Sequence, residues 1–450
     1  MFQSLPGFRD FYPEDCFIRN HIFRIWRQSA RLFGFQEYDA PLLEPLELLT
    51  TKSGEEIVTQ LFNFVDKGGR AITLRPEMTP SLARLIGAKA NGMAKPIKWF
   101  NISENFRYER PQKGRLRSFY QFNADIFGEV GPSADAESIA LLIQSLISFG
   151  FRDEDFCIRL SDRNLWVYFL HTWDIEDTEA IAKVLAIIDK IEREKPEKTI
   201  ELLNLYFGNK AEIFFNEAKK LAKLNTLEAI QDFFKDGNSR KTSDNIEKRL
   251  EEWKCLIEIL SALELMPFIK IDLTIVRGLA YYTGFVFEAF QLIGEGRSIA
   301  GGGRYDNLVK KLGGPDLPAV GWAMGDVTLR DFLELKHLIP KYVEAPDFYV
   351  ITADHECRMV ALHDISQMRK KGYRVEYPLK DMSLNKQIKQ ASDIGAKFAL
   401  IYGPDEVQEN SVTIKDLTQR QEIKISKSNL GNALEMIHQE GKLPTLPTNG

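Results

Sequence analysis

Residues 106–125 read FRYERPQKGRLRSFYQFNAD, with charged side chains alternating with aromatic ones around a turn marked by Pro111 and Gly114. The pattern predicts a β-hairpin, because proline and glycine supply turn geometry between two strand-like runs. Alternate side chains of a strand share a face, so we expect Gln121, Asn123 and Asp125 to line one side of the returning strand. One end of this sheet floor is cationic and the other carries carboxylate and amide groups. That shape suits a phosphate ester joined to a small zwitterion, although a hairpin with a solvated charged face fits this stretch alone equally well.

Composition restricts the class of protein. The chain has 450 residues, 44% apolar and 27% charged, which excludes a disordered polypeptide and predicts two or three domains. A net charge of −5 excludes a broadly basic nucleic-acid coat, so RNA contacts must come from local patches. The four cysteines form no Cys-x-x-Cys pair, so we expect no structural zinc and no disulfide scaffold. No apolar run reaches membrane-spanning length and no signal peptide is evident, so the cytoplasm is expected.

Periodicity divides the chain into segments. Helical spacing from residue 18 to 33 is followed by a short strand over 36–39, and residues 73–85 pass from a strand into a helix. We expect a first domain over residues 1–335, interrupted by a charged helical insertion at about 165–263. A linker follows at 336–346, where prolines are frequent. Residues 347–440 alternate strand and helix and predict a compact α/β domain with a mixed sheet.

Two glycine-containing motifs add further candidates. VRGLAYYTG at 276–284 places Arg277 beside a glycine, so that its guanidinium can approach a ligand closely. The adjacent Tyr281 and Tyr282 offer one hydroxyl to each face of an extended segment. AGGGRYD at 300–306 predicts a flexible backbone that can lie against a ligand. Neither motif matches the phosphate-binding loop or the dinucleotide fingerprint.

Taken in order, these motifs resemble those of the histidyl-tRNA synthetases, which are class II aminoacyl-tRNA synthetases. The resemblance covers nearly the whole chain: the first class II motif corresponds to the helix and strand leading to Pro41, and the second to residues 106–128. Residues 277–284 and 301–306 resemble two segments peculiar to the histidyl enzymes. The resemblance implies an α+β catalytic domain built on an antiparallel sheet flanked by helices. It also implies that the tail domain binds the anticodon and that the protein is a homodimer.

The resemblance implies a two-step reaction with histidine, ATP with Mg²⁺ and tRNA(His) as partners. Histidine attacks the α-phosphate of ATP, and the adenylate then transfers its acyl group to the tRNA 3′ end. Arg107 and Arg277 are the implied catalytic residues. The implied histidine-binding residues are Glu77, Thr79, Gln121, Asp125, Tyr281, Tyr282 and Tyr305. The implied ATP-binding residues are Arg107, Glu109 and Phe119, to which the departure described next adds Arg115 and Arg304 as candidates. The implied contacts to the tRNA acceptor end are Gln112 and Arg117. No residue is assigned to a protein-bound metal.

The third class II motif departs from the family pattern. Thr328 stands where the family has the arginine that reaches the ATP γ-phosphate, and Val327 replaces the preceding acid. Arg330 lies about 200° around a helix from Thr328, so it cannot simply substitute. ATP is then held differently, for example by Arg115 or Arg304, or more weakly. Ala280, at a position that is often acidic, is a milder departure.

Two other functions are compatible with such a fold. The first is a synthetase-like regulatory subunit of ATP phosphoribosyltransferase without aminoacylation activity, although such paralogues typically lack the arginine–tyrosine segment and the tail domain. The second is a catalytically inactive RNA-sensing module. In the tail, Lys386, Lys389 and Lys397 form a modest basic cluster, which RNA contact and a solvated helix face explain equally well.

Overall fold

The computed structural model describes residues 2–53, 55–112, 114–191, 194–236, 243–276, 282–294, 296–342 and 345–444. Its contacts divide the chain into two compact units, residues 1–340 and 341–450. Each unit has its own hydrophobic core.

The first unit is built on a sheet that has eight strands among the described residues, in the order β1-β5-β6-β11-β10-β9-β7-β8. Every neighbouring pair is antiparallel except β1–β5 and β7–β8 at the two edges. The strands are β1 (Gln36–Glu37), β5 (Ile97–Phe106), β6 (Ser118–Phe127), β7 (Phe156–Asp162), β8 (Ile269–Ile271), β9 (Phe285–Gln291), β10 (Ser298–Arg304) and β11 (Ala319–Gly325). The predicted hairpin is the β5–β6 pair. The predicted fold class is therefore confirmed, with parallel pairing added at the edges.

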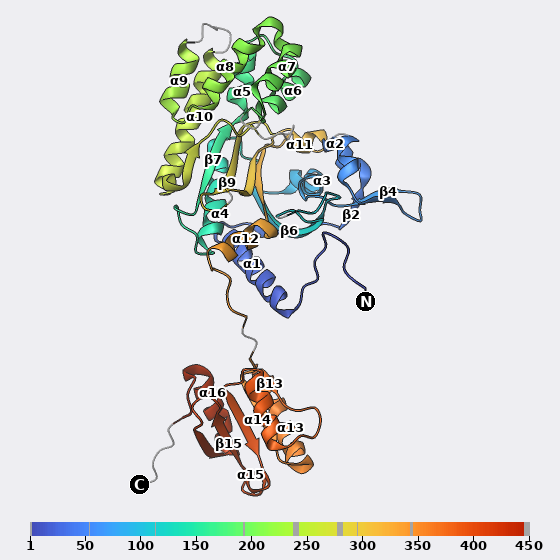
Figure 1. Cartoon of the computed structure of the whole chain (residues 1–450), viewed down its shortest axis with the longest axis vertical. Coiled ribbons are helices and arrows are strands. Elements are labelled where there is room, and N and C mark those ends of the chain that lie inside the picture. The colour runs from blue at the N-terminus through green and yellow to red at the C-terminus, as the bar shows by residue number, and fades with distance from the viewer. Residues whose placement is uncertain are drawn as a thin grey trace. The chain divides into compact units, whose positions relative to one another are not determined.

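Three helices cover one face of this sheet: α1 (Pro13–Leu32), α4 (Pro132–Ile147) and α12 (Asp326–Leu335) (Figure 1). Helix α1 begins at a proline, which suits the first helical position, and ends before Gly34, whose φ of +73° favours glycine. Trp26 of α1 stacks on Phe122 of β6, and Phe122 meets Trp322 of β11 edge to face at 5.0 Å. The aromatic layer fixes α1 against the central strands.

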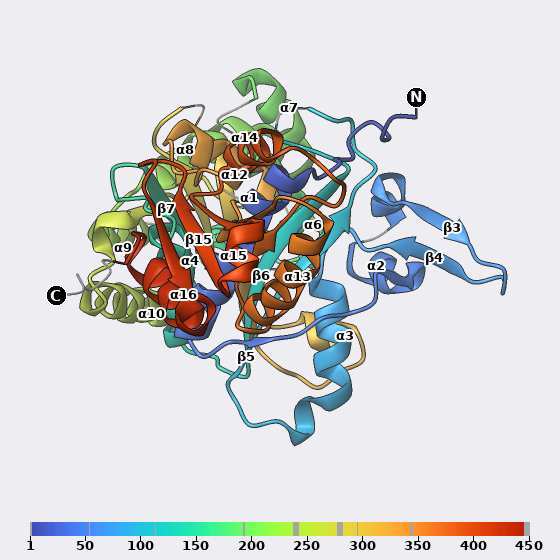
Figure 2. The same ribbon diagram turned by 90° about the horizontal axis from the view of Figure 1, so that it is seen from below.

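On the opposite face of the sheet, helices pack at one end. Helices α3 (Thr79–Lys89) and α11 (Leu308–Lys311) contact each other and share a smaller buried cluster with Phe127, Val286 and Tyr305. Helix α2 (Leu46–Ser53) packs beside them, next to the small sheet formed by β2 (Leu43–Pro45), β4 (Ala71–Leu74) and β3 (Asn63–Val65). Figure 2 shows this β3–β4 hairpin projecting from the body of the unit.

Between β7 and β8 the chain forms a group of helices that gathers beyond one end of the sheet (Figure 1). They are α5 (Arg163–His171), α6 (Thr178–Ile188), α7 (Pro196–Phe207), α8 (Ala211–Ala222), α9 (Leu227–Asp236) and α10 (Ser243–Ala262). Their buried aromatic side chains, among them Trp166 and Phe214, belong to the same hydrophobic cluster as the sheet. Arg249 of α10 donates to Asp162 at the end of β7 over 2.5 Å, and both side chains are buried. The insertion is therefore joined to the sheet by a shared core and a buried ion pair.

The second unit is a five-stranded mixed sheet with the order β13-β12-β14-β15-β16. Strand β12 pairs in parallel with β13 and β14, whereas β14–β15 and β15–β16 are antiparallel. Its elements are β12 (Phe348–Thr352), α13 (His355–Lys370), β13 (Val375–Glu376), α14 (Leu384–Asp393), β14 (Phe398–Tyr402), α15 (Pro404–Gln408), β15 (Ser411–Asp416), β16 (Glu422–Ser426) and α16 (Leu430–Glu440). The α/β mixed-sheet expectation is confirmed. Lys397 donates to the Gly441 carbonyl oxygen over 2.5 Å, so its ammonium is already used within the unit.

The glycine run differs from the prediction. Gly301, Gly302 and Gly303 lie inside β10, hydrogen-bonded to β9 and β11, rather than in a flexible loop. A Cβ atom at Gly302 would lie 2.1 Å from the Gly321 carbonyl oxygen, and one at Gly303 would lie 2.7 Å from that of Phe285. The glycines therefore allow the neighbouring strands to approach closely. Sequence composition alone cannot distinguish this use of glycine from a bend.

Candidate active site

The two faces of strand β6 have different characters. Phe122, Ala124 and Ile126 belong to the buried cluster beneath α1 and α4. The alternating residues Phe119, Gln121, Asn123 and Asp125 therefore share the opposite face, as the period-2 argument predicts. On this face β5 adds the buried polar residues Asn101, Ser103 and Asn105, which pair with Asn123, Gln121 and Phe119. The Asn105 side-chain nitrogen donates to the Gln121 oxygen over 3.4 Å. The result is a polar layer running along two strands.

The adjoining strands supply a floor with almost no side chains. In the register of the sheet, Asp125 pairs with Gly321, and Gly321 pairs with Gly303. One step along, Asn123 pairs with Ala323, which pairs with Gly301. At Gly321 and Gly303 the space that a side chain would fill is taken by neighbours, because a Cβ atom there would lie 1.9 Å from Asp125 Oδ1 and 3.0 Å from Tyr282 Cδ1 respectively. The absence of side chains at these two positions therefore lets the Asp125 and Tyr282 side chains lie close to β11 and β10.

Asp125 and Tyr305 form the buried end of this face. The Tyr305 hydroxyl donates to Asp125 Oδ1 over 2.5 Å, and the side chains are 2% and 5% exposed. Tyr282 is buried in the same cluster as Tyr305. The structure thus brings together three of the predicted histidine-binding residues. A carboxylate has several acceptor positions, so Asp125 can accept from Tyr305 and from a ligand N–H at once.

Tyr38 is a residue near Asp125 that sequence reasoning missed. Its ring stacks on Trp99, the β5 residue that pairs with Asp125. Burial and the Asp125 carboxylate raise the pKa of the Tyr38 phenol well above its usual value, so this phenol stays neutral. Tyr38 comes directly after β1, and the sheet pairing that brings it to Asp125 joins residues far apart in the sequence. No local signal could have identified it.

The other end of the face is cationic and aromatic. The Arg107 guanidinium lies 5.1 Å from the centre of the Phe119 ring, and its Nε donates to the Pro76 carbonyl oxygen over 3.2 Å. The Phe106 amide donates to the Arg75 carbonyl oxygen, so the segment before α3 is fixed along β5. That segment carries Glu77 and Thr79, both partly buried. Arg107, Phe119, Glu77 and Thr79, assigned to one site from separate motifs, thus lie on neighbouring segments.

The loop between β5 and β6 carries the remaining hairpin residues. Arg117 Nε donates to the Glu109 carbonyl oxygen over 3.0 Å, and its guanidinium stacks on the Tyr108 ring. Arg115 is 66% exposed and lies 3.8 Å from the Glu109 carboxylate, a weak surface contact that leaves it able to turn toward a ligand. Gln112 is exposed and pairs with Arg115 in an isolated bridge. The described part of this loop is therefore cationic through Arg115 and Arg117, and the roles of its residues stay predictions.

Arg304 is placed differently from the prediction. Its guanidinium is buried and bonded to the Asp135 carboxylate over 2.5 Å and to the carbonyl oxygens of Glu129 and Gly131. Burial alone would lower the pKa of Arg304, but Asp135 and Asp306 raise it, so the group stays charged. Most of the hydrogen bonds of this guanidinium go to α4 and the loop before it, and Nη1 also donates to Asp306 Oδ1 over 3.3 Å. The geometry argues against the prediction that Arg304 contacts ATP, because a phosphate could reach it only by breaking a buried ion pair.

The contacts of the third class II motif show how Arg330 and Asp326 are used in the fold. Arg330 of α12 pairs with Asp15 of α1 over 3.0 Å and with Glu334 over 3.1 Å, so it ties two helices together. Asp326, at the start of α12, accepts from the Tyr120 amide and pairs with Arg9 over 2.8 Å. These contacts agree with the expectation that Arg330 does not replace the arginine missing at Thr328. Arg277 and Tyr281, together with Ala280, lie outside the described residues.

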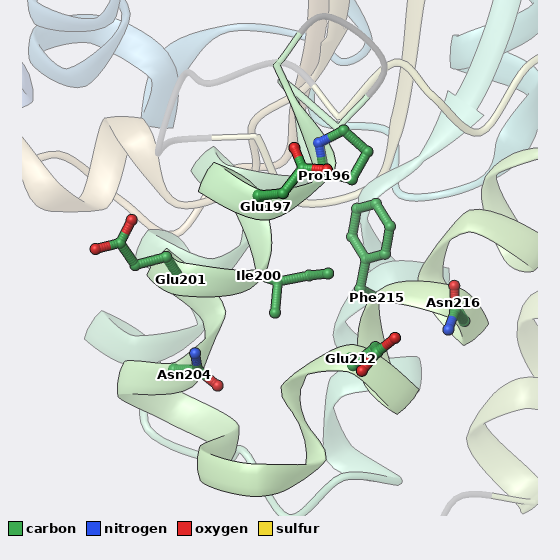
Figure 3. Close-up of a pocket in the computed structure, with 8 residues that line it drawn as sticks. All are labelled: Pro196, Glu197, Ile200, Glu201, Asn204, Glu212, Phe215 and Asn216. Atoms are coloured by element: carbon green, nitrogen blue, oxygen red, sulfur yellow. The ribbon is translucent and has the colours of Figure 1, made fainter.

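A separate hollow lies on the helical insertion between α7 and α8. It has a volume of about 580 Å³, with Ile200 and Phe215 inside and Glu197, Glu201 and Glu212 around it (Figure 3). Its carboxylates would repel a phosphate ester, and none of the predicted site residues lines it.

Within the described residues, no group of three or more histidine, cysteine or acidic side chains is arranged to hold a metal ion. No helix among them combines the length and apolarity needed to cross a bilayer.

Comparison with known proteins decides the family. Residues 7–328 match the family model described as histidyl-tRNA synthetase, and residues 347–436 match the one described as anticodon binding domain. The chain belongs to the histidyl-tRNA synthetase family. The family resemblance inferred from the motifs is thereby confirmed.

Individual relatives agree with this family assignment. A histidine–tRNA ligase of Opitutus terrae is 52% identical over 426 residues, which cover 95% of this chain and 96% of the relative. A histidine–tRNA ligase of Leptospira biflexa is 34% identical, with 97% of this chain and 98% of the relative covered. The crystal structure of histidyl-tRNA synthetase from Nostoc superimposes with a TM-score of 0.77 at 24% identity, covering 97% of this chain and 99% of that one. At that identity the structural likeness establishes the fold.

A further structural relative bears on the alternative function. A Bacillus halodurans structure described as an ATP phosphoribosyltransferase regulatory subunit/histidyl-tRNA synthetase has a TM-score of 0.71 at 23% identity. It covers 90% of this chain and 98% of its own. Because regulatory subunits share the fold, the fold alone does not distinguish the two functions. The present chain matches both the synthetase model and the anticodon-binding model, and this combination favours the enzyme.

Proposed function

We propose that this protein is a histidine–tRNA ligase, which forms histidyl adenylate from histidine and ATP and then transfers the histidyl group to tRNA(His). Family membership over nearly the whole chain supports the reaction. The observation that carries the site is the shared sheet face, which holds the Asp125–Tyr305 pair at one end and the Arg107–Phe119 pair at the other. A ligand with an imidazole at one end and an adenylate at the other matches both ends of this face.

Histidine is the amino acid that the buried end suits. Asp125, fixed by the Tyr305 hydroxyl, would accept a hydrogen bond from one imidazole N–H, and Tyr282 would serve the other ring nitrogen. An apolar amino acid would leave these buried groups unpaired, and a site built in this way rejects such analogues by large factors. Glu77, Thr79 and Gln121 would hold the amino group and backbone of histidine. Gln121 shares a strand face with Asp125, and Glu77 and Thr79 lie on the segment that is hydrogen-bonded to the end of β5, so their positions are compatible with this role.

The cationic end would stabilise the reaction. The histidine carboxylate attacks the α-phosphate, and negative charge accumulates at phosphorus as pyrophosphate leaves. Arg107, held by the Pro76 carbonyl oxygen, would offset this charge, together with Arg277, and Phe119 would stack on adenine. Magnesium bound to ATP neutralises phosphate charge and needs only one or two protein carboxylates. Glu288 of β9, which pairs with Gly301 and is partly exposed, would supply such a group.

The remaining assignments concern the partners of the enzyme. Gln112 and Arg117 would face the tRNA acceptor end, and Arg115 with Glu109 would contribute to ATP binding. The second unit would bind the anticodon. We also propose a homodimer and a cytoplasmic location, both expected from the class. Light scattering coupled to gel filtration would measure the dimer directly.

The decisive experiment is ATP–pyrophosphate exchange measured with each of the twenty amino acids, followed by charging of tRNA(His). Exchange that depends on histidine alone, and histidine esterified to the tRNA, are the expected results. If no amino acid supports exchange, while the protein instead stimulates an ATP phosphoribosyltransferase, the regulatory function replaces this one.

A further inference from the structure

Thr283 and Asp306 directly follow Tyr282 and Tyr305, and they bond to each other. The Thr283 hydroxyl donates to Asp306 Oδ2 over 2.9 Å, and the Asp306 amide donates back to the Thr283 oxygen over 3.0 Å. The Thr283 amide donates to the Arg304 carbonyl oxygen over 2.8 Å. Three hydrogen bonds therefore join the two short segments immediately beside the two tyrosines.

Asp306 is fixed from its other side as well. Its Oδ1 accepts from the Ala319 amide over 3.2 Å and from Arg304 Nη1 over 3.3 Å. Arg304 in turn is held by the buried Asp135 carboxylate of α4. The two oxygens of Asp306 thus serve different partners: Oδ1 anchors it to β11 and Arg304, and Oδ2 binds Thr283. This arrangement gives Arg304, which the geometry removes from the ATP site, a role as the anchor of Asp306.

The hydrogen bonds of this junction connect the backbones of the two tyrosines. The Tyr305 amide donates to the Ala319 carbonyl oxygen over 2.7 Å, and its hydroxyl bonds to Asp125, so Tyr305 is fixed to the sheet at both ends. Tyr282 is only 6% exposed and packs in the same cluster. Its backbone is connected to Tyr305 through the adjacent Thr283 and Asp306. A loss of the Thr283 hydroxyl would free Tyr282 to shift relative to Asp125.

We propose that Thr283 and Asp306 are positioning residues, a latch that holds Tyr282 and Tyr305 at the spacing that the imidazole of histidine requires. The proposal rests on the function proposed above, because it concerns recognition of histidine at the same site. Neither latch residue touches the substrate. Their effect passes through the two phenols, so it falls on histidine binding rather than on ATP binding.

The test uses Thr283→Val, which keeps the shape of the side chain and removes its hydroxyl, and Thr283→Ser, which keeps the hydroxyl. The matched control is Thr413→Val in the second unit. The Thr413 hydroxyl also donates to a carboxylate, Glu406, over 2.8 Å and is likewise partly buried. ATP–pyrophosphate exchange gives KM for histidine, KM for ATP and kcat for each full-length variant, and thermal unfolding gives Tm.

We expect Thr283→Val to raise KM for histidine about tenfold, equivalent to about 1.4 kcal/mol, with KM for ATP within twofold of wild type. Thr283→Ser should restore most of the loss, and Thr413→Val should leave both KM values unchanged. Equal KM values for histidine in Thr283→Val and wild type would overturn the latch, even if Tm falls, because a purely structural bond would produce that result. Absence of histidine-dependent exchange in the wild-type protein would instead refute the proposed function.

Discussion

The Gly321→Ala substitution tests the geometry of the proposed histidine site directly. A Cβ atom at position 321 would lie 1.9 Å from Asp125 Oδ1 and 2.6 Å from its Cγ. Real Cβ atoms essentially never come closer than 3.0 Å to such atoms, so a displacement of at least 3.0 − 1.9 = 1.1 Å is required. The carboxylate is the part that can move, because the 2.8 Å neighbour on the other side is the Ala124 backbone oxygen.

The size of the effect follows from the bond that would be lost. If the carboxylate moves away from Tyr305, the 2.5 Å hydrogen bond lengthens to 2.5 + 1.1 = 3.6 Å, which is no longer a hydrogen bond. A hydrogen bond to a charged group contributes about 1.5–3 kcal/mol. We therefore expect KM for histidine to rise about 10- to 100-fold, since about 1.4 kcal/mol corresponds to a factor of ten.

The assay is ATP–pyrophosphate exchange at varied histidine and saturating ATP, with circular dichroism to establish that the variant folds. Val320→Ala is the matched control, because Val320 neighbours Gly321 on β11 but belongs to the cluster on the opposite face. It should lower stability without a comparable change in KM for histidine. If Gly321→Ala does not fold, Tyr305→Phe removes the same hydrogen bond without added volume. A folded Gly321→Ala protein, or a Tyr305→Phe protein, with the wild-type KM for histidine would refute the placement of Asp125 in the site.

Three further predictions concern other parts of the chain. Arg107→Ala should lower the rate of ATP–pyrophosphate exchange at saturating histidine about 100-fold or more, because it removes a fixed cation that stabilises the transition state by about 3 kcal/mol. A decrease of less than about threefold would exclude this role of Arg107. Arg304→Gln should lower the free energy of unfolding in urea by about 3–5 kcal/mol, because it leaves the buried Asp135 carboxylate unpaired. If the variant is as stable as wild type but has a selectively higher KM for ATP, the original prediction that Arg304 contacts ATP is restored. In the second unit, burial would raise the pKa of Asp416, but hydrogen bonds from Gln419 and Thr418 lower it below 3.8. Its carboxylate therefore stabilises the folded state above pH 3.8, and this contribution is lost as the pH falls through the folded pKa. In Asp416→Asn the backbone amides of β15 should therefore exchange hydrogen faster than in wild type at neutral pH. The difference in exchange rate between the two proteins should shrink below pH 3.8, and a difference that is independent of pH would contradict the stabilising role of the carboxylate.

The polar face of β6 shows how much of the structure a local sequence pattern predicts. Alternation along 118–127 predicted which side chains share a face, because the period of a strand is fixed by backbone geometry. The structure places Gln121, Asn123 and Asp125 together for that reason. The polar layer of β5 and Tyr38 were missed, because their membership depends on which strands become neighbours.

Arg304 shows where reasoning from the sequence reaches its limit. The arginine was suggested as an ATP contact because Thr328 stands where the family has its third-motif arginine. Its partner Asp135 is 169 residues away in the sequence, and their pairing is set by the packing of α4 against β11 and β6. The glycine run was misinterpreted in a similar way, because the need for glycine arises from the close approach of β11 and β9 rather than from a turn.

The sequence by itself determined the fold class, the order of its segments and the family, because strand and helix periods and motif spacing are local properties of the chain. The tertiary structure alone decided which side chains meet: the Tyr305 hydroxyl with Asp125, 180 residues apart, Arg304 with Asp135, and Thr283 with Asp306. The physical reason is that a hydrogen bond or ion pair needs atoms within about 3 Å. Distances on that scale between remote segments are fixed by sheet register and packing, which no local pattern encodes.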